Sequence, residues 1–242
     1  MTGNPFPLDS PLLVLWEYAS EERLRTRNEA YRRLVRGVNA EELAFEAVAE
    51  VSPRRVLEVG CGTGELAERV LRELGAEVVA VDISGRMVAL TAARGVDARV
   101  ADVQALPFED AEFDVAVANW VLYHAADVDL AIGELARVLR PGGRLVAATV
   151  GVGHMREAWA LVGGEPTRDL SFWSENGAQR LRQAFRDVER RDALGTLVFP
   201  DAQTLREFVA ASITRAHLAE NVPEFEGSLE TRSAHVVFVA EK

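Results

Sequence analysis

The chain has 242 residues, of which 48% are hydrophobic and 27% charged, and its formal net charge at pH 7 is −11. This balance is typical of a globular protein with a sizeable core and excludes a disordered or fibrous chain. The acidic excess disfavours a nucleic-acid partner, because such surfaces usually depend on a basic excess. Cys61 is the one cysteine, which excludes an intramolecular disulfide and a cysteine-based zinc site, and we expect no metal.

Residues 1–53 predict a helical N-terminal lid. Helical periodicity extends over 13–36 and 40–50, and the Ser52-Pro53 pair then disfavours further helix. The start of the chain has no basic segment, and its apolar run 12–16 is too short for a signal sequence or a membrane span. We therefore expect a cytoplasmic protein without a membrane partner.

Residues 54–150 repeat one pattern, a short apolar run, a turn and a helical stretch, which predicts a parallel sheet. The runs are rich in valine and alanine without alternation, as expected when helices cover both faces. One helix is expected over 127–140, and another ends at Gly75. The expected strands are 55–60, 77–82, 98–102, 113–119 and 144–150.

The remaining residues, 151–242, predict a mixed segment whose two strands pair antiparallel at the sheet edge. The expected elements are helices over 154–162, 174–186 and 201–217, a Gly-Gly and Pro loop at 163–167, and strands over 188–199 and 235–240. The fold class is therefore α/β, a doubly wound, mostly parallel sheet with a helical N-terminal lid and an antiparallel edge hairpin at the C-terminal end. We expect a single domain over 1–242, with its core at 54–150.

A glycine-rich turn joins the first core strand to the next helix, in the sequence Gly60-Cys61-Gly62-Thr63-Gly64. Glycines let a ligand approach the backbone, and the free N–H groups of a helix start attract an anion. Dinucleotide-binding domains share such a turn, but Glu65 stands where their third glycine would fall and would face a pyrophosphate unfavourably. A nicotinamide-dependent reductase is therefore the weaker hypothesis.

Two carboxylates lie on the first and second core strands. Glu58 falls inside a strand, where an unpaired charge is costly, so its partners are loop N–H groups alone or also a ligand ammonium. Asp82 ends the second strand, where a carboxylate can accept from both hydroxyls of a ribose, with a helix N-cap as the alternative. Ile83 and Met87 follow, and they pack either on an adenine face or in the core.

The third and fourth strands also end in polar residues. Asp102 can accept from an exocyclic adenine amine and the Val103 N–H can donate to a ring nitrogen, with simple turn formation as the alternative. Asn119 ends the fourth strand and precedes His124. These positions border the crevice where ligands bind in open α/β sheets.

In this order the motifs resemble those of class I S-adenosylmethionine-dependent methyltransferases, in particular the ubiquinone-biosynthesis-like group. The resemblance covers 56–150 and is carried by the segments 58–64, 81–84, 102–114 and 139–145. It implies a Rossmann-like methyltransferase fold, S-adenosylmethionine as cofactor, and an enzyme that methylates a small-molecule acceptor.

The resemblance also implies roles for particular residues. Gly60 and Gly62 would lie against the methionine portion, Asp82 would hold the ribose, and Asp102 with Val103 would hold the adenine. The Asn119 carbonyl would face the amine of the cofactor. Related enzymes often reach the cofactor carboxylate with an N-terminal tyrosine or arginine, for which Tyr18 and Arg23 are the candidates.

The acceptor is less defined by the sequence. Trp120-Val121-Leu122 follows Asn119 where N-methylating relatives carry two prolines and an aromatic, so DNA- or glutamine-directed amino methylation is disfavoured. His124 is the candidate general base if the acceptor is a hydroxyl, and a structural histidine otherwise. The four tryptophans lie outside the expected strands and either line an apolar or aromatic acceptor pocket or attach the lid.

Two other functions stay open at this point, an RNA methyltransferase and a non-catalytic S-adenosylmethionine-binding protein. Lys242 is the one lysine and alanine and arginine are abundant, a composition typical of GC-rich genomes. A role in bacterial specialised metabolism is our hypothesis, and the sequence leaves monomer and homodimer open.

Overall fold

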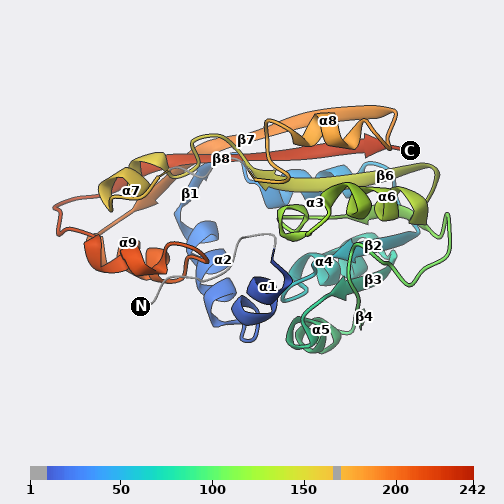
Figure 1. The fold of residues 1–242 in the computed structure, drawn as a ribbon, viewed down its shortest axis with the longest axis horizontal. Helices are drawn as coiled ribbons and strands as arrows, with labels where there is room; N and C mark the ends of the chain where they lie inside the picture. Colours follow the sequence, from blue (N-terminus) through green and yellow to red (C-terminus); the bar gives the residue numbers. More distant parts are fainter. Residues whose placement is uncertain (1–9, 166–169) are drawn as a thin grey trace.

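The computed structural model describes residues 10–165 and 170–242, so positions 166 and 167 of the predicted loop lie outside the described residues. Eight described strands form one sheet in the order β1-β7-β8-β6-β5-β2-β3-β4 (Figure 1). The strands from β6 to β4 run parallel, whereas β8, β7 and β1 add to β6 antiparallel. The strands are β1 (Val35–Gly37), β2 (Arg55–Val59), β3 (Glu77–Asp82), β4 (Asp97–Val100), β5 (Phe113–Val117), β6 (Leu139–Val150), β7 (Asp187–Phe199) and β8 (Leu229–Glu241).

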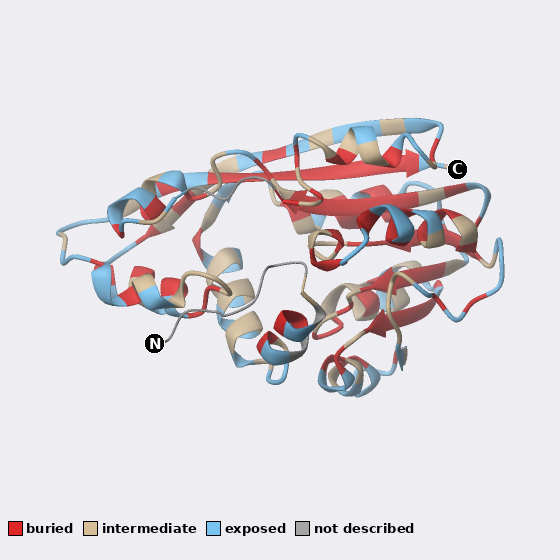
Figure 2. Cartoon of the chain, viewed as in Figure 1, coloured by how far each residue is buried: buried red, intermediate tan, exposed pale blue. Residues whose placement is uncertain are grey.

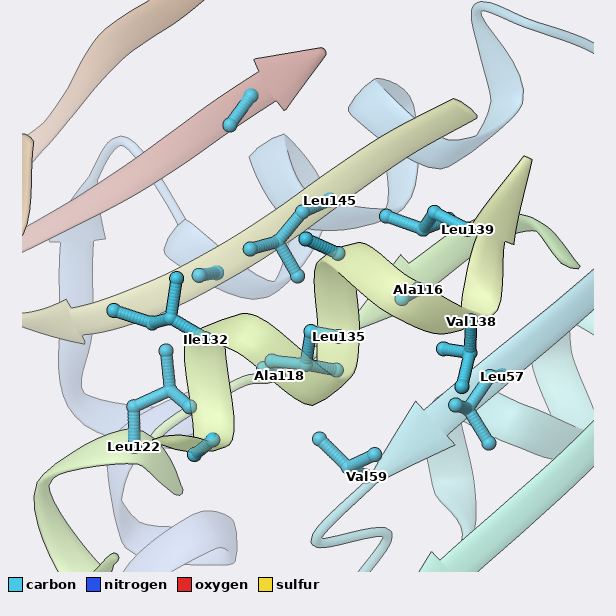
Figure 3. Close-up of a cluster of buried hydrophobic side chains, with 14 of the residues drawn as sticks. Leu57, Val59, Ala116, Ala118, Leu122, Ile132, Leu135, Val138, Leu139 and Leu145 are labelled. Atoms are coloured by element: carbon cyan, nitrogen blue, oxygen red, sulfur yellow. The ribbon is translucent and has the colours of Figure 1, made fainter. Parts of the chain in front are cut away.

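Helices cover both faces of the parallel strands. On one face Ile132 and Leu135 of α6 pack in one cluster with Leu57 and Leu145 of the sheet (Figure 3). On the other face α3 and α4 cover the alternate strand residues, including Val56. The described helices are α1 (Pro11–Glu17), α2 (Glu22–Leu34), α3 (Ala40–Ala49), α4 (Glu65–Leu74), α5 (Gly85–Ala92), α6 (Val128–Val138), α7 (Arg156–Leu161), α8 (Gly177–Leu181) and α9 (Ala202–Ala210), with 3₁₀ turns η1 (Leu122–His124) and η2 (Ala216–Asn221).

Burial on both faces explains the strand composition. Successive residues of a strand point to opposite faces, and β5 is buried at all five positions. Figure 2 shows the central strands buried and the outer faces of the helices exposed. This arrangement confirms the doubly wound α/β fold predicted from the sequence.

The N-terminal segment differs from the prediction of one helix over 13–36. The chain turns after α1, and α2 starts at Glu22 and gives way to β1. The turn lets Arg23 and Arg27 reach back to the buried carboxylate of Glu17, at 3.1 and 2.6 Å. Gly37 of β1 then fits against Gly195 of β7, where a Cβ on either residue would clash with the opposite backbone.

Two C-terminal helices are shorter than predicted. The helix expected over 174–186 is reduced to α8, and Asn176 before it accepts the Trp173 N–H through its side chain at 2.9 Å. The helix expected over 201–217 ends at Ala210, and the carbonyl of Ala211 accepts from Arg27 at 2.6 Å instead of continuing a helix. In Figure 1 α9 lies beside α2, and the two helices are in contact.

The antiparallel pair predicted at the sheet edge is present as β7 and β8. The last strand is longer than expected, because β8 pairs with β7 from Leu229 onwards rather than from His235. It also lies inside the sheet, between β7 and β6, while β1 covers part of the outer edge of β7. The connection between the two strands carries α9 and η2.

Candidate active site

A cavity of about 680 Å³ lies at the carboxyl ends of the parallel strands, where open α/β sheets bind ligands. Helices α1 and α2 supply one wall, and His235 of β8 lies at another side. The predicted site residues that line it are Tyr18, Glu58, Gly60, Gly62, Asp82, Ile83, Asp102, Val103, Asn119 and His124. Arg23 and Met87 are not part of the lining.

The glycine turn after β2 has a backbone that other residues would adopt only with strain. Gly60, Gly62 and Gly64 have φ values of +66°, +53° and +78°, all in the left-handed region. A Cβ on Gly60 would lie 2.5 Å from a methyl of Val121, and one on Gly64 would lie 2.6 Å from the hydroxyl of Thr91. The turn therefore leaves an open backbone surface at the base of the cavity.

Asp82 connects this turn to the next strand tip. Its carboxylate accepts the Gly62 N–H at 3.0 Å and the Ser84 N–H at 2.9 Å. The hydroxyl of Ser84 donates to the carbonyl of Tyr18 at 2.8 Å, which attaches the lid to the same tip, and its oxygen caps α5. The Ile83 N–H is a further backbone donor to this carboxylate, which has about four lone-pair sites and so retains capacity for a ligand hydroxyl, while burial raises the pKa of the carboxyl.

Glu58 carries a buried carboxyl oxygen that lacks a partner. Its side chain lines the cavity with the residue 6% exposed, and Oε2 makes no hydrogen bond with any described residue. Burial raises the pKa of Glu58 to about 8, opposed in part by the Ala67 N–H. A cationic ligand group would satisfy this oxygen, so the site suits the ammonium of a bound amino-acid moiety.

Asp102 is held by its own turn. Its Oδ1 accepts the Gln104 N–H at 2.9 Å, and the Gln104 side-chain amide bonds both oxygens at 3.1 Å. The amide oxygen of Gln104 accepts in turn from Asp127 at the start of α6, at 2.7 Å. Asp102 therefore forms the turn, as one of the two interpretations predicted, and Asp102 and Val103 also border the cavity.

The tip of β5 contains a strained residue. Asn119 accepts the Ala148 N–H through its side chain at 3.1 Å, so its backbone is the part that a ligand would meet. Trp120 has a φ of +52°, which is unusual for a bulky residue, and its N–H donates to the Ala148 carbonyl at 2.8 Å. Strain of this kind is characteristic of functional sites, and here it places the Trp120 indole in the cavity wall.

Of the two N-terminal residues predicted to contact the cofactor carboxylate, one lines the cavity and the other does not. Tyr18 lines the cavity, and burial raises the pKa of its hydroxyl. Arg23 instead binds Glu17 and lies over the Trp16 ring, 4.9 Å from its centroid. Arg27, one helical turn further along α2, lines the cavity, and the sequence analysis missed it.

Met87 is fully buried, which fits the core interpretation rather than an adenine contact. His124 is 7% exposed and lies between two tyrosines, with its ring centroid 6.1 Å from that of Tyr18 and 4.6 Å from that of Tyr123. Both the ring and its two neighbours border the cavity.

The sequence analysis also missed several residues of the cavity wall, namely Tyr31 of α2, Phe208 of α9, Ile213 and His235 of β8. It placed His235 at the start of the last expected strand and gave it no role in the site. A signal was present in the sequence, because Thr231, Ser233 and His235 are polar residues two apart just before the apolar run 236–240, so they share one face of a strand.

Comparison with known proteins agrees with this geometry. Residues 57–147 match the family model described as a methyltransferase domain. A malonyl-[acyl-carrier protein] O-methyltransferase of Pseudescherichia vulneris is 32% identical over 198 residues, covering 78% of this chain and 77% of that protein. A demethylmenaquinone methyltransferase of Thermus thermophilus is 43% identical over 110 residues, which cover 43% of this chain but only half of that protein. The solved [4+2]-cyclase SpnF is 28% identical, with a TM-score of 0.55 over 84% of this chain and 80% of that one.

The chain belongs to the class I S-adenosylmethionine-dependent methyltransferases, in the ubiquinone-biosynthesis-like group. The predictions of a methyltransferase and of S-adenosylmethionine as its cofactor are thereby confirmed. Among residues 10–165 and 170–242, no helix is long and apolar enough to cross a membrane.

Proposed function

We propose that this methyltransferase acts on a small-molecule acceptor with an apolar or aromatic body, bound beside the cofactor beneath a lid formed by the described N-terminal residues 10–53. One observation carries the proposal: a single cavity continues from the glycine turn to a wall that includes Trp120, Tyr123 and Phe208. Its volume lies within the roughly 300–1,000 Å³ of small-molecule sites, which are lined mostly by apolar and aromatic side chains. The two relatives named above act on different acceptors, so neither name transfers to this chain.

The proposed cofactor contacts follow the cavity wall. Glu58 receives the ammonium, and Asp82 accepts from the ribose hydroxyls. The adenine lies between Ile83 and the Asp102-Val103 tip. The remaining contacts are backbone groups of Gly60, Gly62 and Asn119 against the methionine portion, and Tyr18 with Arg27 toward the carboxylate.

When bound, S-adenosylmethionine supplies a methyl group already activated by its sulfonium. The chain therefore has mainly to align the acceptor with that methyl and to exclude water. The lid serves both needs, because Tyr18 is attached to Ser84 of the core and Arg32 of α2 binds Glu65 of α4 at 2.6 Å. We also propose that the chain acts as a single domain in the cytoplasm, in bacterial specialised metabolism.

Transfer of a labelled methyl group tests this function. Tritiated S-adenosylmethionine is offered with catechol, 1-naphthol, aromatic amines and thiols, with malonyl-loaded acyl carrier protein and with total RNA as separate arms. Transfer to small molecules supports the proposal, and transfer to RNA alone overturns it. Calorimetric binding of S-adenosylmethionine without transfer to any arm would favour a non-catalytic binding protein.

The general-base role of His124 stays a prediction. If His124 takes the acceptor proton, His124→Gln lowers kcat about 10²–10⁴-fold while the Kd for S-adenosylmethionine stays constant. Unchanged turnover in this variant would remove His124 from the chemistry.

A further inference from the structure

A second polar cluster lies in the wall of the same cavity, beside Trp120, which directly follows Asn119 in the chain. The hydroxyl of Tyr31 is 2.9 Å from Nδ1 of His235 and also bonds the hydroxyl of Ser233. The His154 ring lies behind His235, with centroids 4.4 Å apart, and its Nδ1 accepts the Ala234 N–H at 3.2 Å. Tyr31 and His235 border the cavity.

The orientation of His235 leaves one ring nitrogen for a ligand. Nδ1 bonds Tyr31, and the ring lies nearly perpendicular to that of Trp120, at a centroid distance of 5.5 Å and an interplanar angle of 84°. No described residue makes a hydrogen bond to Nε2 of His235, although the residue is only 5% exposed. A buried imidazole in a ligand cavity with one nitrogen held and the other open has the arrangement of an oriented base.

The surroundings keep the ring neutral. Burial lowers the pKa of His235 well below its usual value, and the neighbouring His154 lowers it further. The pKa of His154 is itself lowered to about 4 by burial and by Arg215. The other ionisable group facing His235 is Tyr31, whose pKa burial raises to about 12, so it stays a neutral hydroxyl. At neutral pH His235 therefore has a free lone pair.

We propose that Nε2 of His235 is the general base for a hydroxyl-bearing acceptor, and that Tyr31 is the positioning residue that orients it. This inference rests on the proposed function and assigns it to O-methylation. The acceptor oxygen forms its bond to the methyl carbon as the carbon–sulfur bond breaks with its electron pair going to sulfur. The hydroxyl proton passes to Nε2, and the imidazolium later releases it to water.

The chemistry of the cluster also selects the acceptor. A base whose conjugate acid has a low pKa is a weak base. It removes a proton from an acidic hydroxyl, that of a phenol or an enol, far more readily than from an alkyl alcohol. The rings of Trp120 and Tyr123 in the wall suit a flat aromatic body of that kind. His124, in contrast, lies beside Tyr18 at the lid's attachment to the cofactor side.

The pH dependence of catechol and 1-naphthol methylation tests the proposal. In the wild type with saturating S-adenosylmethionine, kcat/KM for the phenol is expected to be flat between pH 7 and 9, because His235 is neutral throughout. His235→Gln is expected to lose about 10²–10⁴-fold at pH 7. Without the base only the phenolate reacts. At pH values below the phenol pKa of about 10, kcat/KM of His235→Gln is therefore expected to rise up to tenfold per pH unit.

Further variants separate chemistry from structure. Tyr31→Phe is expected to lower kcat more than it changes KM, with the Kd for S-adenosylmethionine within about twofold of wild type. His217→Gln, on an exposed residue of η2, is the matched control and is expected to behave as wild type. Two results would overturn the proposal. One is a loss of kcat/KM in His235→Gln that is equal at every pH, and the other is a loss that appears in His124→Gln but not in His235→Gln.

Nitrogen-15 NMR of labelled histidine gives a readout that needs no turnover. In the complex with S-adenosylhomocysteine, His235 is expected to carry its proton on Nδ1, donating to Tyr31, and to lose this tautomer preference in Tyr31→Phe. A proton found on Nε2 overturns the proposal, because that nitrogen could not then accept one. The tautomer of His235 can be read even if neither phenol is methylated. Failure of the proposed function and failure of the base role of His235 can therefore be told apart.

Discussion

Glu58 makes the unliganded protein less stable at neutral pH, in a way that a single substitution can measure. Burial raises the pKa of its carboxyl from 4.5 to about 8. Below pH 4.5 the group is protonated in both the folded and unfolded chain, and it has no effect. Between pH 4.5 and 8 only the unfolded chain is ionised, so stability falls by about 1.4 kcal/mol per pH unit. Above pH 8 the loss is constant.

The substitution Glu58→Gln removes this dependence. At pH 7 the wild type has lost about 3 kcal/mol of stability to this ionisation, and at pH 8 about 4 kcal/mol, so the variant should be more stable by similar amounts. Urea unfolding of the unliganded proteins at pH 5, 6, 7 and 8 gives the difference. Glu46→Gln, on an exposed residue of α3, is the matched control. A difference between Glu58→Gln and wild type that stays constant over this range would refute the reasoning.

The same substitution should weaken cofactor binding. If the ammonium takes the unpaired Oε2, binding ionises Glu58 and releases up to one proton between pH 6 and 7.5, below the α-amino pKa of about 7.7–8.0. Calorimetry in two buffers of different ionisation enthalpy measures this release. Glu58→Gln should abolish it and raise the Kd roughly ten- to hundredfold, since a hydrogen bond to a charged group contributes about 1.5–3 kcal/mol. Equal proton release in both proteins would place the ammonium elsewhere.

Two further predictions concern the turn and the lid. Gly60→Ala puts a Cβ 2.5 Å from Val121 at a residue with a φ of +66°. We therefore expect the free energy of unfolding to fall by about 1–3 kcal/mol and cofactor binding to be much weaker. A variant that binds the cofactor normally would show that the turn can relax. Arg27→Gln should raise the Kd for S-adenosylmethionine, measured by calorimetric titration, while Arg23→Gln leaves it within about twofold. Both arginines bind Glu17, but only Arg27 lines the cavity. Equal effects of the two substitutions would argue for an indirect role of Arg27.

The parallel part of the fold was predictable because each of its signals is local. The strand predicted over 77–82 is β3 itself, and the apolar stripe of α6 is buried as expected. The break between α1 and α2 was not predictable, since the helical periodicity continues through it. What decides the break is the ion pairing of Glu17 with two arginines, which only the folded chain brings together.

The two halves of the site differ in the same way. The cofactor side consists of strand tips followed by short motifs, so Gly60, Asp82 and Asp102 could be placed from neighbours in the sequence. Ile83 and Met87 could not be told apart, because both are apolar and only four positions separate them; the structure puts Ile83 in the cavity wall and Met87 in the core.

The acceptor side depends on contacts between distant residues. Tyr31 and His235 are 204 positions apart and meet because β8 lies deep in the sheet while α2 closes over its end. The polar alternation before the last apolar run marks His235, but no local motif pairs it with Tyr31, because the two residues are 204 positions apart. Relatives that match this chain are named for different acceptors. We therefore propose that the identity of the acceptor is to be sought at His235 and its neighbours rather than in the motifs that define the family.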